Sequence, residues 1–381
     1  RSKLDALLEE LRGLAAELRA RDGLERVLPE VTQADLGEPE DVSRLVEATS
    51  VVLTTAGPFA RQGNGLVEAC VTHGVDYCDI TGETDWVASN VQQHDSAALA
   101  SGARIVHLCG HDSVPWDLLT LAFAERLKTE HGGETLASVH FEDHIKATAS
   151  GGSIETIFDA VRRPKSDGQD YLLWRGEAAG FGQDTDAHLT SVPQRTDKGW
   201  LGPFLMAPVN ARAVARSNAL NQYSGDSPLV YAEGRLHTTR TAAWKDTLSL
   251  SVFVASFFVT PLRWILRNYV LPRPGEGPSD RDMDSGFLEV RGVGTGSAGS
   301  VVRGTLRFND DPGYRDTARM LVESGLCLLD DRTGGPRARS DLKCTRGGVW
   351  TPAACQGLAL LKNLVETGTE YSMEDHGHVE K

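Results

Sequence analysis

The densest group of reactive side chains is Cys109-Gly-His-Asp-Ser-Val-Pro-Trp-Asp117, which carries an imidazole, two carboxylates and a hydroxyl. His111 is a candidate general acid or base, because an imidazole titrates near neutral pH. Asp112 and Ser113 are candidate catalytic partners, but both residue types also cap helices, and Pro115 is typical of a first helical turn. The run therefore predicts either a catalytic loop or a helix start beside an ordinary surface histidine.

Two shorter runs also have unusual composition. Ala56-Gly57-Pro58-Phe59 combines a glycine, which lets the backbone approach a ligand closely, with a proline that stiffens the turn. Glu83, which ends Thr81-Gly-Glu, is expected either to hydrogen bond a substrate or cofactor ribose, or to cap a helix beginning near Asp85. No Ser/His/Asp or Cys/His arrangement has the spacing of a nucleophilic site.

Short apolar runs alternate with amphipathic stretches and must position these groups. The runs predict strands at 31–35, 51–55, 76–80 and 104–108, and helices at 2–20, 42–48, 65–72 and 87–100. Such alternation indicates a doubly wound, Rossmann-like parallel sheet with helices on both faces. Ligands bind outside the carboxyl ends of the strands in such a sheet, which is where the three unusual runs begin.

The pattern changes after Asp117 to longer strands, glycine-rich loops and a polar stretch at 162–199, which indicates a second domain of α+β character. Gly292–Gly299 is expected to be a hairpin, because a strand-like run follows it. Apolar positions between Trp350 and Val365 predict a final helix. We therefore expect three parts: a dinucleotide-binding domain at 1–119, a substrate or dimerisation domain at 120–345, and a C-terminal helical segment at 346–381.

Composition narrows the classes of partner. The chain has 381 residues and is 40% apolar, enough for two cores. A formal net charge of −14, without a basic run interleaved with aromatics, argues against nucleic acid and favours a small-molecule substrate. Six scattered cysteines without zinc-site spacing predict no metal site and a reducing, cytoplasmic location.

The segment 248–266 is almost entirely apolar or hydroxylic. Its uninterrupted part stops at Pro261 and Arg263, short of the roughly 20 apolar residues that span a bilayer. Three interpretations remain open: a buried or subunit-interface helix, which would suit a homodimer; a peripheral contact with a membrane or lipid droplet; and a true span.

Hydride transfer on this architecture needs phosphate-binding glycines at the first strand-to-helix turn, and the sequence has none there. The chain opens on Arg1 instead of Met. We therefore expect the first βα unit to be missing, and Arg1 to lie at the tip of the second strand. A cation at that tip can meet a ribose 2′-phosphate.

Several segments resemble the saccharopine dehydrogenase-like oxidoreductases, a group that includes trans-acting enoyl reductases and a lipid-droplet-associated relative. The resemblance spans nearly the whole chain. It rests on 51–59, 79–83, 103–107, 110–117, 150–153, 206–208, 216–220, 311–314 and 347–352.

This resemblance implies NADPH as cofactor. It implies that Arg1 and Ser2 face the 2′-phosphate, that Asp35 contacts the adenine, and that Ala56, Gly57, Pro58 and Phe59 lie near the nicotinamide. His111 departs from the family, which more often has Phe at this position, so an obligatory proton transfer by His111 is not implied.

The expected function is therefore an NADP-dependent reductase of an acyl, enoyl or lipid-like substrate. The alternative is a non-catalytic protein of a lipid droplet or membrane that retains the fold. Saccharopine chemistry ranks third, because no constellation of Arg and Lys to bind three carboxylates is evident.

Overall fold

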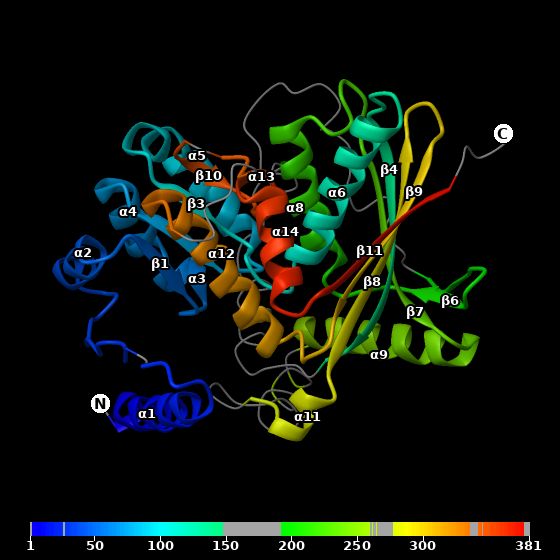
Figure 1. The fold of residues 1–381 in the computed structure, drawn as a ribbon. Helices are drawn as coiled ribbons and strands as arrows, with labels where there is room; N and C mark the ends of the chain where they lie inside the picture. The colour runs from blue at the N-terminus through cyan, green and yellow to red at the C-terminus, as the bar shows by residue number, and fades with distance from the viewer. Residues whose placement is uncertain are drawn as a thin grey trace.

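The computed structural model describes residues 2–25, 27–147, 192–259, 277–335, 342–344 and 346–376, together with Pro261 and Trp264. In chain order its elements are α1 (Ser2–Asp22), α2 (Pro39–Glu47), β1 (Val51–Thr54), α3 (Phe59–Gln62), α4 (Asn64–His73), β2 (Asp76–Asp79), α5 (Thr84–Ser101), β3 (Arg104–Val106), α6 (Val114–Glu130), β4 (Leu136–Lys146), β5 (Gln194–Arg195), β6 (Trp200–Gly202), α8 (Ala207–Asn221), β7 (Val230–His237), α9 (Arg240–Phe258), α11 (Asp280–Asp284), β8 (Phe287–Gly296), β9 (Val301–Phe308), α12 (Arg315–Thr333), β10 (Gly348–Trp350), α13 (Pro352–Cys355), α14 (Gly357–Glu366) and β11 (Glu370–His376). They form two sheets with α6, α8, α13 and α14 between them (Figure 1).

The first sheet has the strand order β1-β2-β3-β10, and every pairing in it is parallel. Tyr77 and Ile105 pack with side chains of α4 and α5. The residues that follow them, Cys78 and Val106, pack with side chains of α12. Since successive side chains of a strand point to opposite faces, helices cover both faces of this sheet, and the predicted doubly wound architecture is confirmed.

The strand predicted at 31–35 was wrong, because this stretch is irregular in the structure. A strand requires a neighbouring strand to pair with its N–H and C=O groups. Within the part of the chain that the structure describes, no strand pairs with 31–35 or with the outer edge of β1.

The second sheet has the order β11-β9-β8-β4-β7-β6-β5. The hairpin expected at Gly292–Gly299 is confirmed, because β8 and β9 pair antiparallel around it. Gly292 also lets α6 approach the sheet: a Cβ at this position would lie 2.8 Å from the ring of Phe123. The second sheet is thus pressed closely against the buried helix α6.

The single C-terminal helix predicted from Trp350 was wrong at its start. Trp350 belongs to β10, where it pairs with Val106, and the helical part is divided into α13 and α14. Pro352 begins α13, as expected for proline in a first turn. The segment after residue 345 therefore gives a strand to each sheet, β10 to the first and β11 to the second.

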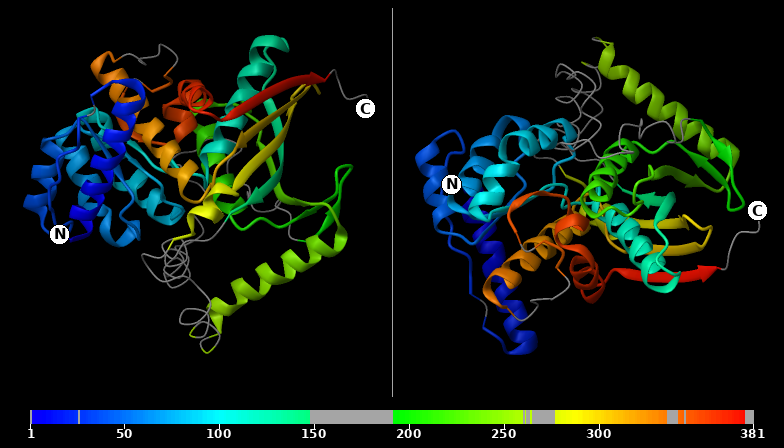
Figure 2. Two further views of the ribbon diagram at one scale, coloured as in Figure 1. Left: turned by 60° about the horizontal axis from the view of Figure 1, so that its bottom comes forward. Right: turned by 90° about the horizontal axis from the view of Figure 1, so that it is seen from above.

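Helix α9 packs on β6 and β7 and extends away from the body of the molecule (Figure 2). Its buried positions are small, such as Ala243 and Ser256, whereas Leu248 and Phe258 are 65% and 72% exposed. The described part of the apolar segment is therefore not a core helix. Among the described residues, no helix is both long and apolar enough to cross a membrane.

Candidate functional site

The loop after β2 holds the turn after β1. The buried carboxylate of Glu83 accepts hydrogen bonds from the main-chain nitrogens of Phe59, at 2.7 Å, and Ala60, at 3.2 Å. These N–H groups belong to the first turn of α3, which has no intrahelical partner for them. Glu83 therefore caps α3 with its side chain. It also occupies the expected cap position of α5, the helix near Asp85, but its side chain makes no capping hydrogen bond there.

In the turn at 56–59 the backbone is exposed and the ring of Phe59 is buried. Gly57 is exposed, whereas Phe59 is buried and stacks on Trp86 at 5.8 Å. The turn is braced by Gly57 N, which donates to Thr55 O, and by Ala56 N, which donates to the Thr54 hydroxyl. A ligand at this edge would thus meet main-chain atoms, as a close-approach glycine suggests.

A buried Asp–His pair fixes the second and third loops. The Asp79 carboxylate lies 2.7 Å from Nδ1 of His107 and accepts hydrogen bonds from the Tyr77 hydroxyl and from Thr81 N. Both side chains are fully buried. The sequence analysis did not single out this pair, although Asp79 and His107 each stand at a strand end. Its evident effect is to hold the main chain of both loops.

The third loop brings together the three predicted catalytic residues. Nε2 of His111 lies 3.8 Å from Oδ1 of Asp112, and His111 N donates to the Thr317 hydroxyl of α12. The Ser113 hydroxyl is buried and donates to the carbonyl oxygen of Asp112. Ser113 occupies the cap position of α6, but its side chain makes no capping hydrogen bond. The alternative that Ser113 caps a helix is therefore right about its position before α6, but its hydroxyl does not form the hydrogen bond of a cap.

His111 and Asp112 differ in exposure. His111 is buried, and desolvation lowers the pKa of its imidazole, so His111 is neutral at neutral pH. Asp112 keeps 36% of its side chain exposed, and partial burial raises the pKa of its carboxyl. Of the two, Asp112 is the group that solvent and a substrate can reach.

The start of α8 meets these loops. A Cβ at Gly82 would lie 3.8 Å from Oδ2 of Asp112 and 3.7 Å from Cε of Met206. The second loop, the third loop and the residue before α8 therefore converge on one point. The first sheet supplies Gly82 and Asp112 there, and the connection that follows β6 supplies Met206.

Asp117, at the other end of the reactive run, has a structural position. Its buried carboxylate accepts a hydrogen bond from Ala353 N at 2.9 Å and hydrogen bonds from the hydroxyls of Ser217 and Thr351. Burial raises the pKa of Asp117 to about 7. It thus joins α6, α8 and α13 in the layer between the two sheets.

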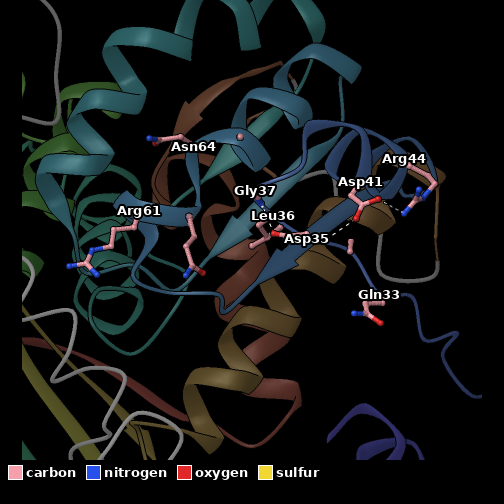
Figure 3. A pocket seen from close by; sticks show the side chains of 11 residues that line it. Gln33, Asp35, Leu36, Gly37, Asp41, Arg44, Arg61 and Asn64 are labelled. Carbon is pink, nitrogen blue, oxygen red and sulfur yellow. Dashed lines mark hydrogen bonds and ion pairs between the residues drawn. The ribbon is translucent and has the colours of Figure 1, made fainter. Parts of the chain in front are cut away.

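A pocket of about 760 Å³ opens beside the turn at 56–59 (Figure 3). It is bounded by the irregular stretch before α2, by α2 itself, by the end of α3 and by the first turn of α4. Its lining residues are Gln33, Ala34, Asp35, Leu36, Gly37, Asp41, Arg44, Arg61, Gln62, Asn64 and Gly65.

The pocket contains one predicted cofactor residue, Asp35. Its Oδ1 accepts from Gly37 N at 2.8 Å, and its own N donates to Asp41, which also pairs with Arg44 at 2.7 Å. The sequence analysis missed Arg44 and Arg61 because it expected the cation to be Arg1. Arg1 lies outside the described residues, and Ser2 begins α1. The only sequence feature that could have identified Arg61 is its position two residues after the 56–59 turn.

Comparison with known proteins reveals relatives along most of the sequence. The chain is 32% identical over 359 residues to the trans-acting enoyl reductase of Mycobacterium ulcerans, covering 89% of this chain and 84% of that protein. It is 31% identical over 354 residues to the trans-acting enoyl reductase of Mycobacterium tuberculosis, covering 88% and 82%. No family model matches the sequence.

Two solved structures are similar at low sequence identity. One is saccharopine dehydrogenase (L-Glu forming) from Saccharomyces cerevisiae, with a TM-score of 0.49 and 9% identity over 95% of this chain and 91% of that one. The other is homospermidine synthase from Legionella pneumophila in complex with NAD, with a TM-score of 0.45 and 9% identity over 94% and 83%.

Proposed function

The chain belongs to the trans-acting enoyl reductase family of oxidoreductases, and we propose that its cofactor is NADPH and its substrate an enoyl thioester or a related lipid-like acyl compound. The observation that carries the cofactor proposal is the pocket beside the 56–59 turn. It lies at the carboxyl edge of a parallel sheet, where α/β enzymes bind nucleotides. When bound, NADPH would supply a hydride to the β-carbon of the substrate.

The residues of the pocket fit one end of such a cofactor. Arg44 and Arg61 supply guanidinium groups for a phosphate, and the partly exposed Asp35 can still accept hydrogen bonds from a base or ribose. Gly65 faces open space in the first turn of α4, which favours a close approach of negative charge to that helix end. The backbone of Gly57 would border the reactive end.

Asp112 is the proposed proton donor for the substrate α-carbon. It is partly exposed, its carboxyl has a raised pKa, and it faces the point where Gly82 and Met206 converge. His111 stands beside it as a buried, neutral imidazole, with Nε2 3.8 Å from Oδ1 of Asp112. A donor placed near the thioester carbonyl would stabilise the developing enolate.

A fluorescence titration with NADPH and NADH tests the cofactor proposal. Arg61→Ala should weaken NADPH binding by about tenfold or more, the cost of losing a charge-assisted hydrogen bond. NADH binding should change less if Arg61 meets the 2′-phosphate. Arg303→Ala is the matched control, because Arg303 is exposed on β9 in the other sheet. Failure of the wild type to bind either nucleotide would leave the non-catalytic, lipid-associated alternative.

We also propose that α9 makes a peripheral contact with a lipid surface. The exposed side of α9 carries Trp244, Leu248, Val252 and Phe258, and there is no charged residue between Leu248 and Phe258. Such a face costs free energy in water and gains it at an apolar boundary. A homodimer through the same face is the competing outcome.

The six free, buried cysteines support the expected cytoplasmic location.

A further inference from the structure

Two carboxyl groups lie together in the second sheet, on the face that is covered by α6 and α8. Asp143 of β4 and Glu233 of β7 are 0% and 1% exposed. The two strands are parallel, and Glu233 is paired with Phe141, two residues before Asp143. Side chains two residues apart on a strand share a face, so both carboxyl groups point into the same layer, where each shifts the pKa of the other.

The donors around this pair serve three of its four oxygens. The indole Nε1 of Trp116 donates to Oδ1 of Asp143 at 3.0 Å. Asn210 Nδ2 donates to Oε1 of Glu233 at 2.9 Å, and the Tyr231 hydroxyl donates to its Oε2 at 2.6 Å. Oδ2 of Asp143 receives no N–H or O–H donor from the described residues. Two ionised carboxylates would leave this oxygen unsatisfied and adjacent to a like charge, which is costly in a buried layer.

No cation that the structure describes neutralises the pair. Arg235 of β7 shares the face with Glu233, but it donates to Asp246 of α9 and to the carbonyl oxygen of Ile145. The other titratable, charged and polar groups around the pair are Trp116 and Asp117 of α6, Tyr231 of β7, Asn210 of α8, Arg235 of β7 with its partner Asp246 of α9, and Glu142 on the opposite face of β4 with its partner Lys198. A proton on Asp143 would therefore let Oδ2 of Asp143 donate a hydrogen bond and would remove one of the two negative charges.

We propose that Asp143 and Glu233 share one proton, and that the protonated pair positions Trp116 and the start of α8 beneath the candidate site. The ring of Trp116 lies 5.6 Å from that of His111 and 5.8 Å from that of Phe204. Asn210 stands one turn after Met206, whose Cε approaches Gly82. Asp143 and Glu233 are positioning residues, because they act on the site through Trp116 and α8.

The shared proton makes this positioning dependent on pH. Burial raises the pKa of Glu233 to about 7 and that of Asp143 well above its ordinary value. Because the charge of Glu233 adds to the rise for Asp143, Glu233 ionises first, near pH 7, and leaves one proton shared by the pair. The pair loses this last proton only at a higher pH. The second negative charge would then push the carboxylates apart and displace the indole and Asn210.

Infrared difference spectra of the full chain test the shared proton without cofactor or substrate. As the pH rises past about 7, the wild type should lose the carbonyl band of one protonated carboxyl group and keep a second band, which is that of the shared proton. Asp143→Asn should remove the band that remains above pH 7, because the amide oxygen can accept from Trp116 while its NH₂ group donates permanently to Glu233. Asp117 also titrates near 7, so Asp117→Asn is the control that must keep the band of the pair.

The effect on turnover rests on the proposed function. In an NADPH-dependent assay the wild type should lose kcat/KM about tenfold per pH unit once the shared proton leaves, whereas Asp143→Asn should not show this loss and Asp143→Ala should be slow at every pH. A wild type without a carbonyl band above pH 7, or an Asp143→Asn variant that keeps this band, overturns the inference. A chain without turnover that still shows the band contradicts only the proposed function.

Discussion

Oε1 of Glu83 lies 2.7 Å from the main-chain nitrogen of Phe59, so a residue after β2 fixes the turn after β1. Replacement of Glu83 by Ala should leave two N–H groups of α3 without their acceptor. We expect a loss of about 1–3 kcal/mol in the free energy of unfolding. Glu83→Gln, which keeps one acceptor, should lose less. Urea denaturation measures both, with the exposed Glu40→Gln as the control. Equal stability of Glu83→Ala and the control would contradict this role.

Arg104 joins the first sheet to α12. Its Nη2 lies 2.6 Å from Asp76 and also donates to the carbonyl oxygen of Leu328, while Nη1 pairs with Asp331. Asp76 and Arg104 are both buried. Arg104→Leu should therefore cost about 3–5 kcal/mol of stability, because it leaves a buried carboxylate with fewer partners.

The control for Arg104 is Arg315→Leu, since Arg315 forms exposed ion pairs at the start of α12. Exposed pairs contribute little, so this change should cost much less stability than Arg104→Leu. The comparison requires denaturation curves of both variants under the same conditions. Similar losses of stability in the two variants would show that the burial of Asp76 does not strengthen its ion pair with Arg104.

Asp117 should make the stability of the fold depend on pH. Its pKa is raised from 3.8 to about 7 in the folded chain, so between these values the folded state binds more protons than the unfolded state. Stability from this group is complete below about pH 4 and falls as the pH rises to about 7, by up to about 4 kcal/mol. Asp117→Asn should flatten this part of the profile, which urea midpoints across the range would reveal. An unchanged profile would refute the assignment.

The third loop offers a test of which residue transfers a proton. Asp112→Asn should lower kcat about 100-fold or more, the typical contribution of a general acid. His111→Phe should change kcat only a few-fold, because the buried imidazole is neutral and packs against Trp116. The assay follows NADPH oxidation with an enoyl thioester, and circular dichroism checks that both variants fold. The reverse ranking would assign the proton to His111.

The exposed side of α9 predicts an effect on association. A double variant with Leu248→Ser and Val252→Ser should lower the fraction that sediments with phosphatidylcholine vesicles, because it removes apolar area from an exposed face. The control is Leu99→Ser, which changes an exposed leucine of α5, far from α9. Loss of a dimer in analytical ultracentrifugation, with unchanged vesicle binding, would assign the face to a second copy.

The sequence by itself determined the local elements of the first sheet. Strand-like runs beginning at Val51, Asp76 and Arg104, each followed by a helix, suffice to predict a parallel sheet and to locate its carboxyl ends. They also located the three loops that meet there. These features depend on side chains that are close in sequence, where periodicity is informative.

Only the tertiary structure decided the partners of these loops. The bonds from Glu83 to Phe59 and from Asp117 to Ala353 cross 24 and 236 positions of the chain, and no local pattern specifies them. Residues 31–35 do not form a strand, because a strand needs a neighbouring strand with which to pair and no described strand lies beside them. Asp143 and Glu233 likewise read as ordinary polar residues within strands, and they become a pair because β4 lies beside β7 under two buried helices. Burial and neighbours, which set the chemistry of a carboxyl group, are properties of the folded chain.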